Sequence, residues 1–172
     1  MKRLLFYIFL LLQIVLLVIL TGIFENFNDQ GDVITIKTKI PDYYMYDDGI
    51  VKRTLYTEYE ISNIDADKWN NENEIDYNNR VYVLLEENEE GIFEVVAGSD
   101  EPLKKEEHQV LVTAKYNYFD ETRGFHSVRY EIEEIEEIEK YGSFRYDDQL
   151  LVTVLIGKWG QRQILNVEKV EQ

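Results

Sequence analysis

The chain has 172 residues and no cysteine, and 34 acidic residues against 18 basic ones give it a formal charge of −16. The missing cysteines exclude disulfides, thiol catalysis and Cys-based metal sites. Lys2 and Arg3 are the only charged residues before Glu25, so removing their two charges leaves −18 for the rest of the chain. Such an acidic surface repels nucleic acid and anionic lipid, and we therefore expect no nucleic-acid partner.

The first predicted element is a transmembrane helix within residues 1–24. The run from Leu4 to Phe24 is apolar apart from Gln13, Thr21 and Gly22. At ~1.5 Å per residue it reaches roughly 30 Å, which is about the thickness of a hydrocarbon core. Lys2 and Arg3 precede the run and acidic residues follow it, which predicts a cytoplasmic N-terminus and an extracytoplasmic domain over residues 25–172.

A cleaved signal peptide is the main alternative for this segment. Signal peptides have an apolar core of ~7–15 residues that ends at a small-x-small cleavage site. This run is longer, and it offers only Thr21-Gly22-Ile23-Phe24 after Leu20. A retained anchor in the cell membrane is therefore our prediction. Gln13 lies near the middle of the span, where its amide could bond to another membrane helix or could simply be tolerated.

The remainder is predicted to be mainly β, as an antiparallel sandwich or open barrel with one short helix. Residues 32–40 alternate, with Ile34, Ile36 and Ile40 on one face. Short apolar runs and hairpin-like turns then follow one another at close spacing, which favours an antiparallel arrangement. The predicted strands cover residues 50–61, 81–85, 92–97, 109–116, 125–132, 150–156 and 162–167, and residues 63–79 are predicted to form a surface loop with one helical turn around Trp69.

The most unusual segment is residues 131–139, in which Ile132, Ile135 and Ile138 recur every three residues among glutamates. This spacing predicts a short amphipathic helix that covers one face of a sheet. Its wet face could bind Ca²⁺ or a basic partner, although acidity alone does not make ligands converge as a calcium site requires. Two candidate partner surfaces follow, one with Glu133, Glu134, Glu136 and Glu137, and the other an aromatic cluster of Tyr43, Tyr44 and Tyr46.

No segment carries a recognisable catalytic or cofactor-binding motif. His108 and His126 are far apart and neither lies in a ligand pattern, and the chain has no nucleophile elbow or phosphate-binding glycine loop. We therefore expect no cofactor and no metal, and we identify no small-molecule substrate. A carboxylate pair for hydrolysis is the least favoured alternative, because nothing in so acidic a chain selects one pair.

The order of these pieces resembles a family of uncharacterised bacterial membrane-anchored proteins named for a GDYXXLXY motif. The resemblance covers the Leu10–Gln13 run, the segments 31–38, 59–62 and 81–83, and the segment 127–132. Tyr59 matches the last residue of the motif and is followed by Glu60 and Ile61. The earlier motif positions are replaced by Lys52, Arg53, Thr54 and Thr57.

This resemblance implies a protein of no established activity, often found with a multi-spanning membrane protein. Together with the predicted anchor it favours a non-enzymatic accessory protein whose acidic β domain engages a membrane or envelope partner. The alternative is a cation- or ligand-binding envelope domain.

Overall fold

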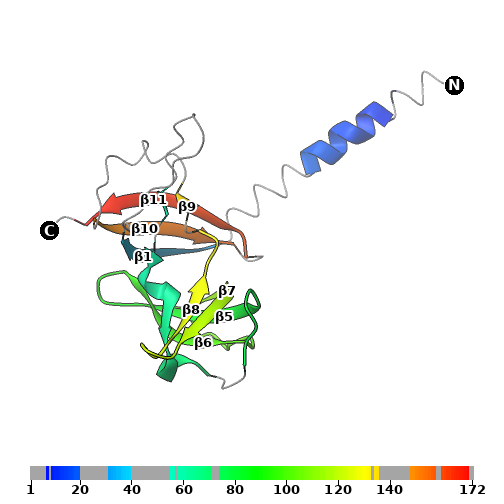
Figure 1. Cartoon of the computed structure of the whole chain (residues 1–172). Coiled ribbons are helices and arrows are strands. Elements are labelled where there is room, and N and C mark those ends of the chain that lie inside the picture. The colour runs from blue at the N-terminus through cyan, green and yellow to red at the C-terminus, as the bar shows by residue number, and fades with distance from the viewer. Residues whose placement is uncertain are drawn as a thin grey trace, which may run out of the picture.

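Two antiparallel sheets packed on each other form the body of the protein (Figure 1). The computed structural model describes residues 7, 9–19, 31–39, 55, 56, 58–70, 74–132, 134, 135, 148–157 and 160–170. The prediction of a mainly β, antiparallel domain is confirmed for these residues.

The first sheet has the strand order β11-β10-β1-β3. It consists of β1 (Asp32–Lys39), β3 (Glu58–Tyr59), β10 (Gln149–Ile156) and β11 (Arg162–Lys169). Along β1 from Ile34 and along β10, every second residue is buried, and the positions between are exposed or half-buried. This alternation of period two makes one face of the sheet a packing surface.

The second sheet has the order β4-β8-β7-β5-β6 and curls into a nearly closed five-stranded barrel. Its strands are β4 (Asn63–Asp65), β5 (Arg80–Glu87), β6 (Phe93–Ser99), β7 (Gln109–Asp120) and β8 (Phe125–Arg129). The predicted hairpin between residues 81–85 and 92–97 is confirmed, since β5 and β6 pair antiparallel across a turn at Asn88 and Gly91.

Trp69 closes most of the remaining gap in the barrel. It forms a parallel bridge with Gly98 of β6, and the amide of Asn70 donates to the carbonyl of Gly98 at 2.9 Å. A Cβ atom on Gly98 would lie 2.6 Å from the indole ring, so only glycine fits beneath Trp69. The first and last strands of the barrel are joined through this contact.

One continuous core lies between the two sheets. The inward residues of β1 and β10, among them Ile36 and Val152, belong to the same buried cluster as Val83 of β5 and Val112 of β7. Burial on this scale is the main favourable contribution to folding. Figure 1 shows the sheet of β1, β10 and β11 above the barrel strands β5 to β8.

Three predictions about local structure are wrong. Within the predicted helix 131–139, residues Glu134–Ile135 form strand β9, which pairs with β2 (Leu55–Tyr56). Glu131, two residues after the end of β8, has φ 59°, which lies in the left-handed region. Ile132 and Ile135 are buried in the core. The described residues of this segment are therefore not helical. Residues 133 and 136–139 lie outside the described part.

The other two corrections concern residues 50–79. The predicted surface loop 63–79 is wrong in its first part, where Asn63–Asp65 is strand β4 and Ile64 and Trp69 are buried. The predicted helical turn is present as the 3-10 turn η2 (Ala66–Lys68), and residues 74–79 form a loop as predicted. The predicted strand 50–61 is instead divided among β2, β3 and the 3-10 turn η1 (Glu60–Ser62). Its residues 50–54 and 57 lie outside the described part.

The predicted membrane segment is described in part. Residues 9–19 form an α-helix, and residues 1–6, 8 and 20–24 lie outside the description. The large apolar side chains of this helix are 43–66% exposed. Among the residues that the structure describes, no helix has both the length and the apolar character needed to cross a membrane.

Candidate functional site

Tyr59, Glu60 and Ile61, which the family resemblance singles out, lie where β3 leaves the first sheet for the barrel. The Tyr59 ring is fully buried and its hydroxyl donates to the carbonyl of Ile132 at 2.7 Å. In the opposite direction, the buried Tyr130 hydroxyl donates to the carbonyl of Ile61 at 2.8 Å. This reciprocal tyrosine pair joins two segments about 70 residues apart in the chain. This pair therefore helps to hold the two sheets together.

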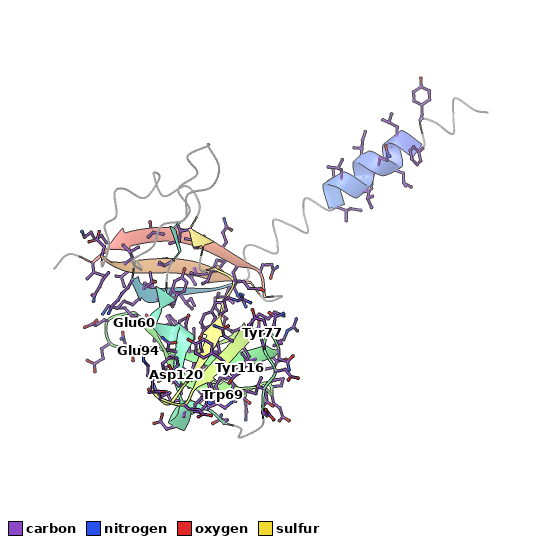
Figure 2. The ribbon with its side chains drawn as sticks, viewed as in Figure 1. Glu60, Trp69, Tyr77, Glu94, Tyr116 and Asp120 are labelled. Atoms are coloured by element: carbon purple, nitrogen blue, oxygen red, sulfur yellow. The ribbon has the colours of Figure 1, made fainter. Side chains whose placement is uncertain are left out.

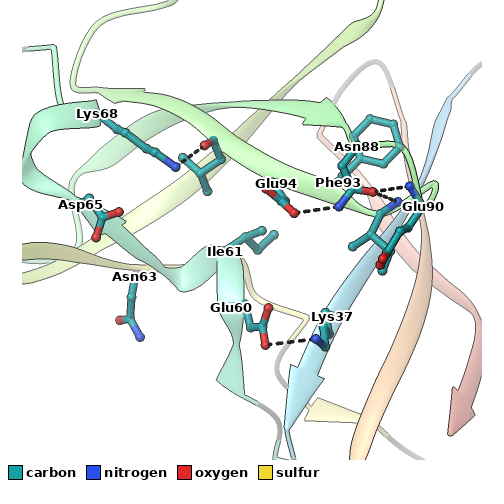
Figure 3. A pocket seen from close by; sticks show the side chains of 12 residues that line it. Lys37, Glu60, Ile61, Asn63, Asp65, Lys68, Asn88, Glu90, Phe93 and Glu94 are labelled. Carbon is teal, nitrogen blue, oxygen red and sulfur yellow. Dashed lines mark hydrogen bonds and ion pairs between the residues drawn. The ribbon is translucent and has the colours of Figure 1, made fainter. Parts of the chain in front are cut away.

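A mixed-charge cleft lies beside this junction (Figure 3). It has a volume of about 270 Å³ and is lined from β1, η1, β4 and β6 and the β5–β6 hairpin. Lys37 approaches Glu60 at 3.9 Å, Lys68 donates to the Val95 carbonyl at 3.0 Å, and Asn88 donates to Glu94 at 2.7 Å. Its side chains are thus largely engaged with one another.

The described residues contain no group of three or more His, Asp or Glu side chains placed to hold a metal ion. Of the acidic residues singled out in the sequence, Glu134 lies in β9, while Glu133, Glu136 and Glu137 lie outside the described part. Tyr43, Tyr44 and Tyr46 lie outside it as well. Gln13 lies in the N-terminal helix and is exposed there.

His126 of β8 is packed in an aromatic cluster near the closure of the barrel. Its ring stacks on Trp69 with centroids 4.3 Å apart, and Phe119 lies at 4.6 Å. The Tyr116 hydroxyl lies 3.2 Å from Nδ1 of His126. Burial lowers the pKa of His126 and raises the pKa of Tyr116, so both groups remain neutral near pH 7. Trp69 and Tyr116 lie together in the barrel, with ring centroids 5.9 Å apart (Figure 2).

Three cations lie in register across the three central strands of the barrel sheet, where β5 begins and β8 ends. Arg80 of β5 is the direct cross-strand partner of Lys115 on β7, and Lys115 is in turn the partner of Arg129 on β8. Directly opposed residues project from the same face of a sheet, and like charges placed there destabilise the pairing. We call Arg80, Lys115 and Arg129 the cationic row.

Within the described part, neither Arg80 nor Lys115 forms an ion pair or a hydrogen bond with its side chain. The third member, Arg129, donates from Nη2 to the Asn78 side chain at 3.4 Å. In a chain with almost twice as many acids as bases, a set of adjacent cations without paired carboxylates is unexpected. Its formation depends on the register between distant strands, so it could not be predicted from the sequence.

A basic cleft of about 340 Å³ adjoins the cationic row. Arg80, Thr113, Lys115, Glu131 and Arg162 line it, together with Ala114 and Gly160. The Arg162 side chain is 9% exposed, and its guanidinium donates to the carbonyls of Tyr130 and Thr113 and, at 3.1 Å, to the Thr113 hydroxyl. Glu131 approaches Arg162 at 3.8 Å but is 62% exposed, so this pair contributes little stability. The cleft combines three positive groups with one carboxylate and suits an anion.

Comparison with known proteins gives no further assignment: no family model, no curated protein and no solved structure matches this chain.

Proposed function

We propose that this protein is a non-enzymatic accessory protein, anchored in the cell membrane by residues 4–24, whose acidic β domain engages a membrane protein outside the cytoplasm. The observation that carries the proposal is the N-terminal helix over residues 9–19. Its large apolar side chains remain 43–66% exposed around the whole helix. A helix that is apolar on every side is stable only when buried, either in protein or in lipid.

The sequence around the helix supports lipid rather than protein as its surroundings. Lys2 and Arg3 lie before the apolar run and the acidic residues from Glu25 onward lie after it. This charge asymmetry is typical of a segment inserted with its N-terminus in the cytoplasm. The membrane would then also bring the β domain close to any multi-spanning partner, as the family resemblance implies.

The β domain itself supports binding rather than catalysis. Three buried tyrosine hydroxyls are used in internal hydrogen bonds, those of Tyr59 and Tyr130 with carbonyls and that of Tyr116 with Nδ1 of His126. Both clefts are open and lined by charged side chains from several strands. Rigid strands that present fixed charges are suited to recognising a partner surface.

Crosslinking in native membranes tests the partnership. The full chain would be crosslinked before mild detergent extraction, purified and analysed for attached proteins. We expect a multi-spanning membrane protein to be recovered in stoichiometric amounts, and less of it when Gln13 is replaced by Leu if that amide contacts the partner helix. Repeated recovery of the chain alone would argue against an accessory role.

A second candidate is a cation-binding domain: in the cleft of Figure 3, Glu60, Asp65, Glu90 and Glu94 outnumber Lys37 and Lys68, which favours cations there although these carboxylates form no converging ligand set. Calorimetric titration of the detergent-solubilised full chain with CaCl₂ tests it. Heat of binding that disappears in Asp65→Asn and Glu90→Gln variants would support this candidate. A flat titration at millimolar Ca²⁺ would remove it.

A further inference from the structure

The cationic row and the basic cleft lie at the end of the domain where the chain arrives from the N-terminal helix. Asp32, the first residue of β1, pairs with Ile156 of β10, and Ile156 pairs with Arg162 of β11. Arg162 is therefore two strands from Asp32, which corresponds to about 10 Å at the usual spacing between strands. Lys105 also contacts Asp32, at 3.5 Å.

Arg162 fixes the position of the row relative to this end of the molecule. Its guanidinium connects the start of β11 to the carbonyl of Thr113 on β7 and to the carbonyl of Tyr130 after β8. Thr113 is two residues from Lys115 along β7, so the two side chains share a face. The row is thus rigidly held near the point where β1 begins.

The charge of the row is opposite to that of the molecule. The chain carries −16 overall, and an anionic surface should repel it at long range. Repulsion between exposed charges is screened beyond about 8 Å at physiological ionic strength, so a local cluster of cations can dominate at contact. An acidic domain attached next to an anionic surface would therefore approach it through this face.

We propose that the cationic row and the basic cleft bind the phosphate groups of anionic phospholipids in the membrane that holds the chain. This inference rests on the proposed membrane anchor. Arg80, Lys115 and Arg129 contact lipid phosphates, and the adjacent Arg162 adds positive potential to the cleft. Binding orients the acidic domain on the bilayer and leaves the opposite end, with the β5–β6 hairpin, directed away from it.

Phosphate binding would explain why like charges are opposed across three strands. Direct opposition of Arg80 and Lys115, and of Lys115 and Arg129, costs stability in the isolated domain. Phosphates bound between these side chains would relieve that repulsion. Arginine is well suited to this contact because its planar guanidinium donates two parallel hydrogen bonds to phosphate oxygens.

The test measures the orientation of the domain by energy transfer in nanodiscs that contain the full chain. Since the chain has no cysteine, Glu89→Cys in the β5–β6 hairpin provides a single labelling site, nine residues from Arg80. A donor dye is attached there and an acceptor is placed on lipid headgroups. We expect lower transfer in discs with anionic phospholipid than in neutral discs, and loss of this difference at 1 M salt, where the Debye length is about 3 Å.

A triple variant, Arg80→Gln with Lys115→Gln and Arg129→Gln, should abolish the dependence on anionic lipid. The matched control replaces Lys39, Arg123 and Lys169 by Gln, which changes the net charge equally at the opposite end of the first sheet and in the β7–β8 turn. The control should keep the lipid dependence. Equal lipid dependence in both triple variants would overturn the proposal.

Two further results separate this proposal from related ones. If transfer is the same in neutral and anionic discs but changes when a soluble poly-glutamate peptide is added, the row binds an acidic peptide and the lipid proposal is wrong. If the chain cannot be retained in nanodiscs at all, the membrane anchor fails first. A chain that stays in the disc without any lipid dependence contradicts this inference alone.

Discussion

Tyr59 and Tyr130 show how individual side chains hold the two sheets together. Each ring is buried, and each hydroxyl donates to a carbonyl of the segment that contains the other tyrosine. The family resemblance singled out Tyr59 in the sequence, but its hydrogen-bond partner could not be predicted. The bond to Ile132 depends on the folded path of a segment 73 residues away.

We expect Tyr59→Phe and Tyr130→Phe each to lower the free energy of unfolding by about 1–2 kcal/mol, because each leaves a buried carbonyl without its donor. Tyr77→Phe is the control, since Tyr77 is 65% exposed and should change stability by less than about 0.5 kcal/mol. Urea denaturation of the three variants measures this. Equal stabilities would show that the two hydroxyl bonds are not important for the fold.

Glu131 carries a local backbone strain. Its φ of 59° lies in the left-handed region, which costs a residue with a side chain about 1 kcal/mol relative to glycine. We therefore expect Glu131→Gly to raise the free energy of unfolding by up to about 1 kcal/mol, whereas Glu131→Ala should not raise it. A stabilising alanine variant together with a destabilising glycine variant would contradict this interpretation.

His126 should make stability depend on pH. Burial lowers its pKa in the folded protein below the ordinary 6.5, so the unfolded chain binds more protons in this range. Its contribution to stability is fully present above pH 6.5 and is lost as the pH falls through the lowered folded-state value. His126→Gln should reduce the pH dependence of the unfolding midpoint between pH 7 and 5, while His108→Gln, which alters an exposed side chain, should leave the dependence on His126 in place.

Some strands could be predicted from the sequence and others could not. Residues 32–39 and 150–156 have regular apolar alternation and could be predicted, because each has one face against the core and one face outside. Strand β4 has only three residues and carries Asn and Asp, so its pattern resembles a loop. The cationic row and both clefts depend on register between distant strands, which a single sequence does not contain.

The closure of the barrel depends on the contact between the end of η2 and strand β6. We expect Gly98→Ala to lower the free energy of unfolding by about 1–3 kcal/mol, because the added methyl group would overlap the ring of Trp69. The control is Val96→Ala on the same strand, where the side chain is 39% exposed and less is lost. Chemical denaturation followed by Trp fluorescence measures both, and an unaffected Gly98→Ala variant would contradict this view of the closure.

At the scale of the whole molecule, the apolar residues of the N-terminal helix and the charged residues of the β domain occupy separate parts of the chain. An apolar helix lies at one end, and the remainder carries the acidic excess on a mainly β domain with one cationic face. The same division suggested the membrane anchor from the sequence. The orientation that we propose for the domain on the membrane rests instead on where the cationic face lies relative to the start of β1.

Topology in intact cells tests the proposed membrane anchor most directly. With no native cysteine, Glu89→Cys and Lys2→Cys each give the full chain one labelling site, one on each side of the helix. We predict that a membrane-impermeant maleimide labels Glu89→Cys in intact cells, labels Lys2→Cys only after lysis, and that the chain stays in the membrane pellet after carbonate extraction. Release of the chain into the carbonate supernatant, or labelling of Glu89→Cys only after lysis, would contradict an anchored extracytoplasmic domain.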